Sequence, residues 1–261
     1  PHTPYRAPQD FGNPFEKVSL PSWYSQDVID KHMKIPGPHT IQDINMYDDV
    51  TFPKWPRQPG HVTDMEEMRI LIDGYDCGIN YMDGHIGKLL EALERKGVME
   101  DLFIIISSDH GENFGELGIY AEHGTADDIC NRVPMIIRWP GKVKAGHVDN
   151  GFHYNIDLSP TLSDLFGKVP RSSWDGRSFA ASLTSGDDTG REELIFGQCA
   201  HGCQRSVRWD DWIYIRTWHD GYHCFDEEML FNLKSDPHEQ NNVIGEFPDI
   251  AQLARDRKSV V

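Results

Sequence analysis

The central stretch of this sequence spans residues 102–141 and reads LFIIISSDHGENFGELGIYAEHGTADDICNRVPMIIRWPG. It opens with the apolar run Leu102 to Ile106, which is short and rich in β-branched residues. A run of this kind, apolar at every position, is typical of a strand buried on both faces, as in the parallel sheet of an α/β protein. A second apolar run over residues 133–139 ends at Pro140 and Gly141. We therefore expect two strands joined by a polar segment.

Residues that can bind a metal follow the first of these strands. Asp109 and His110 lie side by side where the chain leaves the strand, and open α/β sheets bind ligands at that edge. A carboxylate oxygen suits Ca²⁺, Mg²⁺ or Mn²⁺, and an imidazole nitrogen widens the choice of ion. In the alternative, structural interpretation, Asp109 caps the following turn and His110 packs against the sheet. A further candidate, His123, lies on a glycine-containing loop over residues 122–125.

The order of the motifs resembles that of the sulfatase family, within the alkaline phosphatase superfamily. The matching segments are Asp-His-Gly-Glu at 109–112, the loop with a basic residue at His123, and RVPMIIRWPG at 132–141. PHTPY at 1–5 and LFNLKSDPHE at 230–239 are similar to further family signatures and occur in the expected order. Each segment is a weak signal alone, whereas the ordered set is specific.

The resemblance implies an α/β fold: part of a central mixed, largely parallel sheet flanked by helices, followed by a small antiparallel-sheet C-terminal subdomain. The polar linker over residues 184–191 marks the expected boundary between the C-terminal part of the sulfatase catalytic α/β domain, residues 1–185, and the small subdomain, residues 186–261. The residues agree with this division. Apolar side chains recur every three or four positions and predict a helix over 64–96, ended by Gly97. Short alternating segments after residue 193 predict antiparallel strands.

The resemblance also implies roles for five residues. Asp109 and His110 are expected to ligate a divalent metal, Ca²⁺ first, with Mg²⁺ or Mn²⁺ as alternatives. His2 is expected to contact the substrate and to take part in catalysis. His123 stands where many sulfatases have a lysine, so it can lie beside the sulfate oxygens as a cation or donate a proton to the leaving oxygen. Thr125 is a candidate for binding a substrate oxygen.

The reaction that the resemblance implies is hydrolysis of a sulfate ester, as in an arylsulfatase. A formylglycine made from Cys or Ser is the nucleophile of that family, and no cysteine of this chain lies in the nucleophile signature. We therefore expect formylglycine in a missing N-terminal part and expect the chain alone to be inactive. The expected partners are a small-molecule or carbohydrate sulfate ester and, because a truncated sheet exposes apolar surface, either that N-terminal part or a second copy.

Two other functions compete with this one. A phosphodiesterase or phosphonate monoester hydrolase of the same superfamily would share the Asp-His-Gly region. A non-catalytic sugar-binding or interaction module would use the aromatic and histidine-rich stretch 212–225, whose rings could stack on a sugar. The structural alternative for this stretch is a hairpin whose aromatic side chains pack on the main domain.

The composition of the chain limits the classes of binding partner and the cellular compartments that we expect. The net charge of −17 argues against nucleic-acid binding, and no apolar run is long enough for a membrane span. The five cysteines form no dense framework, and Cys199-x-x-x-Cys203, with His201 and His223 nearby, fits ordinary thiols or one disulfide better than a zinc site. No Asn-x-Ser/Thr sequon occurs, so we expect a bacterial cytoplasmic or periplasmic home.

Overall fold

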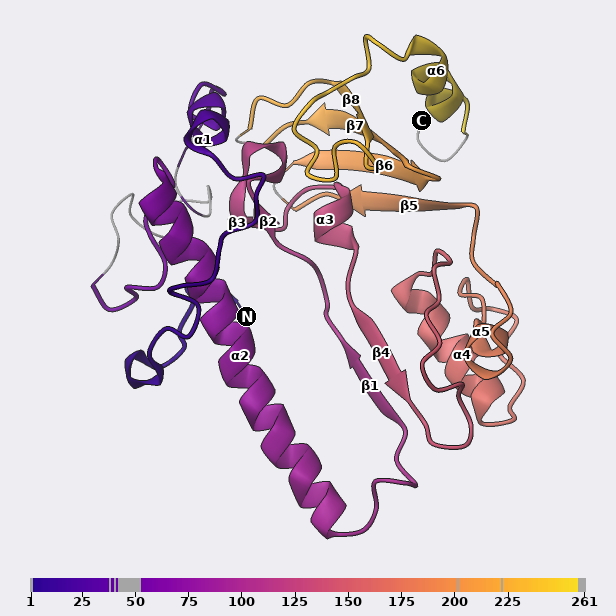
Figure 1. The fold of residues 1–261 in the computed structure, drawn as a ribbon. Helices are drawn as coiled ribbons and strands as arrows, with labels where there is room; N and C mark the ends of the chain where they lie inside the picture. The colour runs from indigo at the N-terminus through magenta and orange to yellow at the C-terminus, as the bar shows by residue number, and fades with distance from the viewer. Residues whose placement is uncertain are drawn as a thin grey trace.

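The computed structural model describes residues 2–37, 39, 41, 53–200, 202–221 and 223–257 (Figure 1). Its α-helices are α1 (Gln26–His32), α2 (Met65–Arg95), α3 (Asp128–Asn131), α4 (Leu158–Leu165), α5 (Ala180–Thr184) and α6 (Pro248–Asp256). Its strands are β1 (Ile104–Ser107), β2 (Asn113–Phe114), β3 (Tyr120–Glu122), β4 (Met135–Arg138), β5 (Glu193–Gln198), β6 (Cys203–Trp209), β7 (Trp212–His219) and β8 (Glu228–Asn232). Within these residues, no helix combines the length and the apolar character needed to cross a membrane.

Helix α2 confirms the helix expected from the apolar periodicity. The Asp64 side chain caps its first turn by accepting hydrogen bonds from the backbone N–H groups of Glu66 and Glu67, both at 2.9 Å. At the other end, Gly97 adopts a φ of 69°, a left-handed conformation that glycine reaches without strain. The N-terminal half of α2 contributes buried Met68 and Leu71 to a core cluster. The C-terminal half is more exposed.

Strands β1 and β4 form an antiparallel pair, in which Ile105 lies opposite Ile137. Every strand pair among the described residues is antiparallel, so the expected largely parallel sheet is absent from this part of the chain. The reason is the connection: the chain leaves β1 through the β2–β3 hairpin and α3, then returns alongside β1. The expectation that the apolar strand is buried on both faces is wrong here, because Ile106 is 37% exposed and Ile136 is 59% exposed.

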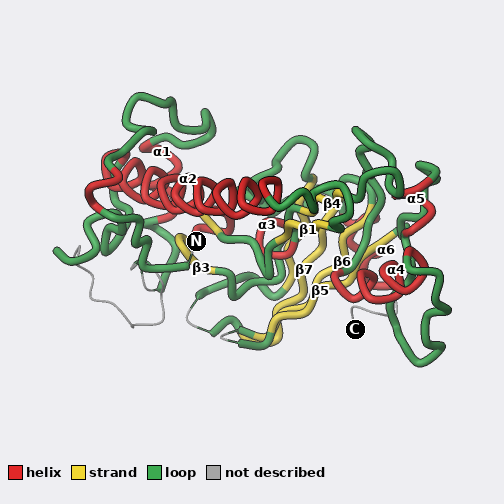
Figure 2. Tube along the Cα trace, turned by 90° about the horizontal axis from the view of Figure 1, so that it is seen from below, coloured by secondary structure: helices red, strands yellow, loops and turns green. Residues whose placement is uncertain are grey.

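The C-terminal region contains the antiparallel sheet that the alternating segments predict. Its strand order is β5-β6-β7-β8, and α6 lies beside it (Figures 1 and 2). One face packs with α6 through a cluster of Val207, Trp209, Tyr214, Leu230, Ala251 and Ala254. The other face buries Ile213, Ile215, Met229 and Phe231. The expected α/β class with a small antiparallel C-terminal sheet is confirmed.

A buried ion pair joins the two expected domains. Asp157, at the start of α4, is fully buried and accepts hydrogen bonds from both terminal nitrogens of Arg191. It also accepts from the backbone N–H groups of Tyr154 and Arg177, each at 2.7 Å. Burial opposes ionisation of this carboxyl, but these bonds lower the pKa of Asp157 below its ordinary value. The boundary near residue 185 stays a prediction.

A second carboxylate, Glu228 of β8, connects the sheet to α6 and gives a stability prediction. It accepts hydrogen bonds from Arg255 Nε and Nη2, both at 2.7 Å, which lower the pKa of Glu228 from 4.5 to about 2. Because the folded-state pKa is lowered, the stabilisation is present above about pH 4.5 and is lost as the pH falls toward 2. We expect Glu228→Gln to cost about 1.5–3 kcal/mol at neutral pH, and less near pH 3.

Urea unfolding at the two pH values measures this difference. The matched control is Glu227→Gln, because Glu227 is the adjacent carboxylate and its side chain is 72% exposed. Its variant should change stability by less than about 0.5 kcal/mol. A cost for Glu228→Gln that is the same at both pH values would contradict the assignment.

Candidate functional site

The Asp-His-Gly-Glu segment lies between β1 and β2, and its glycine is required by packing. A Cβ at Gly111 would lie 1.9 Å from the Ile129 carbonyl oxygen, so only glycine allows this approach. The Gly111 N–H also donates to the Cys130 carbonyl at 2.8 Å. This packing and this hydrogen bond fix the segment against α3, and they thereby orient the side chains on either side of Gly111.

The structure brings His110 and His123 together. Their rings are stacked, with centroids 3.7 Å apart and planes at 18°. Buried Glu112 places Oε2 3.4 Å from His123 Nδ1, and the Tyr5 hydroxyl donates to Glu112 Oε1 at 3.4 Å. One ligand atom from each of His110, Glu112 and His123 lies within 4.8 Å of the others. Two imidazole nitrogens and a carboxylate oxygen at this spacing fit a divalent cation.

The surroundings of His123 shift the pKa of its ring. Its hydrogen bond with Glu112 raises the pKa of His123 above the ordinary value, with burial opposing and the charge of Glu112 adding to the increase. Asp109 stays ionised, because hydrogen bonds from its own backbone N–H and the charge of His110 lower the pKa of that carboxyl.

Of the expected metal ligands, only His110 belongs to this cluster. The Asp109 side chain is 90% exposed and its Oδ1 lies 3.9 Å from His110 Nε2, at the edge of the site. Glu112, which the sequence analysis did not select, contributes the third potential metal-ligand atom of the cluster. In an extended segment, residues two apart face the same side, and that spacing relates Glu112 to His110.

Two expected substrate-binding residues have other surroundings. His2 is exposed, and its described hydrogen bond joins Nδ1 to the Thr3 carbonyl oxygen at 2.5 Å. Thr125 is buried and its hydroxyl donates to Asp127 Oδ1 at 2.5 Å, and its expected role in binding a substrate oxygen stays a prediction. Thr125 thus holds the turn that leads into α3.

The C-terminal subdomain supports this turn directly. Gln204 Oε1 accepts from the Ala126 N–H at 3.1 Å, and fully buried Glu239 accepts from the Asp128 N–H at 2.8 Å. Arg208 Nε donates to Asp128 Oδ1 at 3.3 Å. Burial raises the pKa of Glu239 well above its ordinary value. The 230–239 motif therefore has a structural role at the site: it fixes the start of α3.

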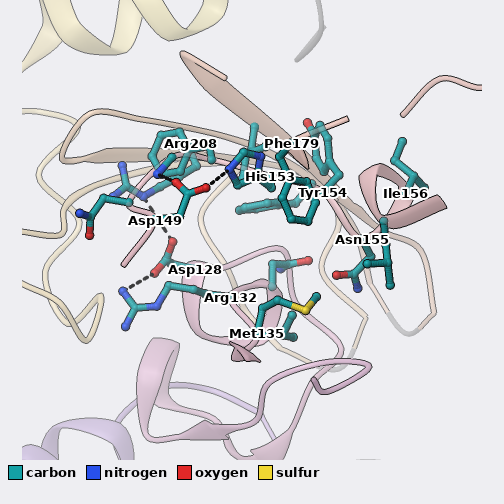
Figure 3. Close-up of a pocket in the computed structure, with 18 of the residues that line it drawn as sticks. Asp128, Arg132, Met135, Asp149, His153, Tyr154, Asn155, Ile156, Phe179 and Arg208 are labelled. Atoms are coloured by element: carbon teal, nitrogen blue, oxygen red, sulfur yellow. Dashed lines mark hydrogen bonds and ion pairs between the residues drawn. The ribbon is translucent and has the colours of Figure 1, made fainter. Parts of the chain in front are cut away.

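A cavity of about 930 Å³ opens beside the cluster, and Asp109, His110 and His123 contribute to its lining. Figure 3 shows charged side chains directed toward it from opposite walls. On one wall Asp128 pairs with Arg208 and Arg132; on the other, His153 Nε2 lies 3.0 Å from Asp149 Oδ2. The sequence indicated His153 as a residue that could line the cleft, with a structural role favoured, and placed Arg132 in a family motif; Asp128, Asp149 and Arg208 were not selected.

The sequence matches the family described as Sulfatase over residues 1–168 and the family described as N-sulphoglucosamine sulphohydrolase, C-terminal, over residues 115–259. The first match covers more than half of the chain. The chain therefore belongs to the sulfatase family, as the ordered motifs predict.

Individual relatives show how much of a sulfatase this chain represents. The N-acetylglucosamine-6-O-sulfatase of Bacteroides thetaiotaomicron is 29% identical over 189 residues, which cover 69% of this chain and 32% of that protein. The solved structure of a phosphonate monoester hydrolase from Silicibacter pomeroyi is 25% identical, with a TM-score of 0.73 over 99% of this chain and 53% of that one. A structure solved in complex with its substrate, D-glucosamine-2-N,6-O-disulfate, is 26% identical, with a TM-score of 0.60 over 75% of this chain and 40% of that one. The chain thus spans about a third to a half of these proteins.

The cluster predicts metal binding that depends on Glu112. Because the Glu112 carboxylate is a candidate metal ligand and also orients His123, Glu112→Gln should weaken binding of Mn²⁺ by about 10- to 100-fold in isothermal titration calorimetry. His110→Ala should weaken it at least as much. The control is His85→Ala, since His85 is an exposed histidine on α2. Equal affinity in all four proteins would exclude this cluster as the metal site.

Proposed function

We propose that this chain supplies part of the active site of a metal-dependent sulfuric ester hydrolase. The observation that carries the proposal is the stacked His110–His123 pair, backed by buried Glu112, at the edge of a cavity lined with charged side chains. A cation beside an anionic substrate, with a ring nitrogen free to give a proton, is what hydrolysis of a sulfate ester requires.

Each residue has a defined part in this proposal. Glu112 Oε2 lies 3.4 Å from His123 Nδ1 and would orient the ring so that Nε2 is the nitrogen that gives a proton to the leaving oxygen. His110 and Glu112 would hold the metal, with Asp109 at the edge of the site, and His2 would approach the sulfate group. A bound metal would supply positive charge beside the sulfate oxygens. Calcium is the ion that the family resemblance implies; the imidazole-rich donor set suits Mn²⁺ as well.

A carbohydrate sulfate is the substrate class that we propose. The Bacteroides relative is a sulfatase of N-acetylglucosamine 6-O-sulfate, and one similar structure contains D-glucosamine-2-N,6-O-disulfate. The cavity, of about 930 Å³, is within the range of ligand sites. Its ion pairs, Asp149–His153 and Asp128–Arg208, offer donors and acceptors for sugar hydroxyl groups.

A phosphonate monoester hydrolase is the second candidate, supported by the Silicibacter pomeroyi structure that matches nearly the whole chain. A sulfate monoester and a phosphonate monoester each carry one negative charge at the reacting group, so the same cations can serve both. The third candidate, a non-catalytic sugar-binding module, would use Trp218, which is 50% exposed, and His219 near the end of β7. Tyr222 and His201, also considered from the sequence, lie outside the described residues.

Turnover by the gene product that contains this chain tests these candidates. We expect hydrolysis of glucosamine 6-sulfate that is abolished by a chelator, and a fall of about 10²- to 10⁴-fold in kcat for His123→Ala, with His85→Ala unchanged. Preferential hydrolysis of a phosphonate monoester would favour the second candidate. Sugar binding that survives chelation, without turnover of either ester, would favour the third.

We further propose that the N-terminal half of a sulfatase covers an apolar face of this chain. Large apolar side chains are exposed on α2, β1 and β4: Ile79, Tyr81, Met82, Leu89, Ile106, Met135 and Ile136. Exposed patches of this kind mark association surfaces. The relatives are about two to three times as long as the matched segment, so they have sequence available to cover it.

Intact mass and size-exclusion chromatography test this association. We expect a second polypeptide with a Cys or Ser nucleophile signature to co-purify, and the purified 29.9 kDa chain without it to hydrolyse no sulfate ester. Replacement of Ile136 by Lys should release the second polypeptide. A homodimer of this chain would instead show self-association, and a stable monomer would exclude both.

A further inference from the structure

The turn between β5 and β6 brings two cysteines into contact. Cys199 Sγ lies 3.6 Å from Cys203 Sγ, within van der Waals contact of two sulfur atoms. Cys199 is exposed and Cys203 is partly exposed. In the described part of the chain, no other pair of sulfurs is in contact. Cys77 and Cys130 are buried, and burial raises the pKa of both thiols, which slows their reaction.

The strand register explains why these two side chains meet. Gln198 pairs with Gln204 across the antiparallel β5–β6 ladder, so Cys199 and Cys203 are the next opposed positions toward the turn. Directly opposed residues on antiparallel strands have Cβ atoms about 4.5–5.5 Å apart, close to the separation that a disulfide needs. A rotation of the side chains with a small closure of the turn brings the sulfurs to bonding distance.

We propose that Cys199 and Cys203 are a reversible dithiol–disulfide pair, a covalent modification site at the edge of the sulfatase cavity. The Cys199 thiolate attacks one sulfur of oxidised glutathione and releases one glutathione thiolate. The Cys203 thiolate then attacks Cys199 Sγ, forms the intramolecular S–S bond and releases the second glutathione. Two cysteine thiols are oxidised and one glutathione disulfide is reduced to two thiols.

The order of attack follows from exposure and hydrogen bonding. The contact with Cys199 raises the pKa of Cys203, and Cys199 is the more exposed of the two thiols, so oxidised glutathione reaches Cys199 first. Once Cys199 carries glutathione, Cys203 is the nearest thiol to the mixed disulfide. The geometry therefore favours closure of the ring over addition of a second glutathione.

Gln198 connects this pair to the candidate active site. Its Oε1 accepts from the backbone N–H groups of Cys199 and Ala200 at 2.9 and 3.0 Å, and its Nε2 donates to the His123 carbonyl at 3.3 Å. A change in the turn is thereby transmitted to the backbone of His123. This consequence rests on the proposed function, whereas the disulfide itself does not.

Peptide mass spectrometry tests the disulfide. Trypsin releases both cysteines in one peptide, residues 192–205, and Cys224 in another, residues 217–234. After treatment of the folded chain with oxidised glutathione and blocking with N-ethylmaleimide, we expect peptide 192–205 to be about 2 Da lighter than its reduced form and unlabelled. Cys224, the exposed control, should carry N-ethylmaleimide or glutathione. N-ethylmaleimide or glutathione on both Cys199 and Cys203 would overturn the proposal.

Two variants separate the disulfide from its effect on the site. Cys203→Ser should stop the reaction at the mixed disulfide, adding glutathione, about 305 Da, to Cys199. For the coupling, Mn²⁺ affinity of the oxidised chain should differ at least about threefold from that of the reduced chain, and the Cys199→Ser/Cys203→Ser variant should show no difference. An unchanged affinity with the disulfide formed would overturn the coupling alone, and a failure to bind Mn²⁺ would count against the proposed function rather than the dithiol.

Discussion

The turn before α3 is the part of the molecule on which the candidate site depends. Buried Glu239 and Gln204 hold its backbone from the C-terminal sheet, and Thr125 and Asp127 hold it from within. Gly111 packs against α3 on the other side. Since His110 precedes this packing point and His123 precedes the turn, the distance between the two rings is set by contacts from three separate segments. The C-terminal sheet and the segment that follows it therefore support the site.

The net charge of the chain does not show that positively charged groups line the cavity. The chain carries a formal net charge of −17, yet the wall of the cavity places Arg208, Arg132 and His153 beside their acidic partners. For an anionic ligand, the nearby cations matter more than distant carboxylates, because salt screens charges beyond about 8 Å.

Sequence reasoning reached the elements that depend on local pattern. The limits of α2 follow from Asp64, Gly97 and the apolar repeat, and the alternation after residue 193 gave the antiparallel sheet. The choice of His110 and His123 as candidates followed from the family motifs, whereas the stacking of their rings was not predicted from the sequence. The features that the sequence did not predict depend on contacts with residues that are distant in the sequence. The exposure of Ile136 depends on which segments cover β4. The Thr125 hydroxyl is bound by Asp127 and Asn113. Glu112 lies beside His123 only because the β2–β3 hairpin brings the two residues together.

Helix α2 combines two kinds of environment in one continuous element. Its first turns are fixed by Met68 and Leu71 in the core, and its C-terminal half exposes Met82 and Leu89. Isolated helical turns are marginal in water, so the second half gains little from packing. In the chain by itself, the amide hydrogens of the last turns should exchange with solvent long before those near Leu71. The helix would thus behave as two cooperative units within one unbroken ladder of hydrogen bonds, and covering its apolar end would merge them into one.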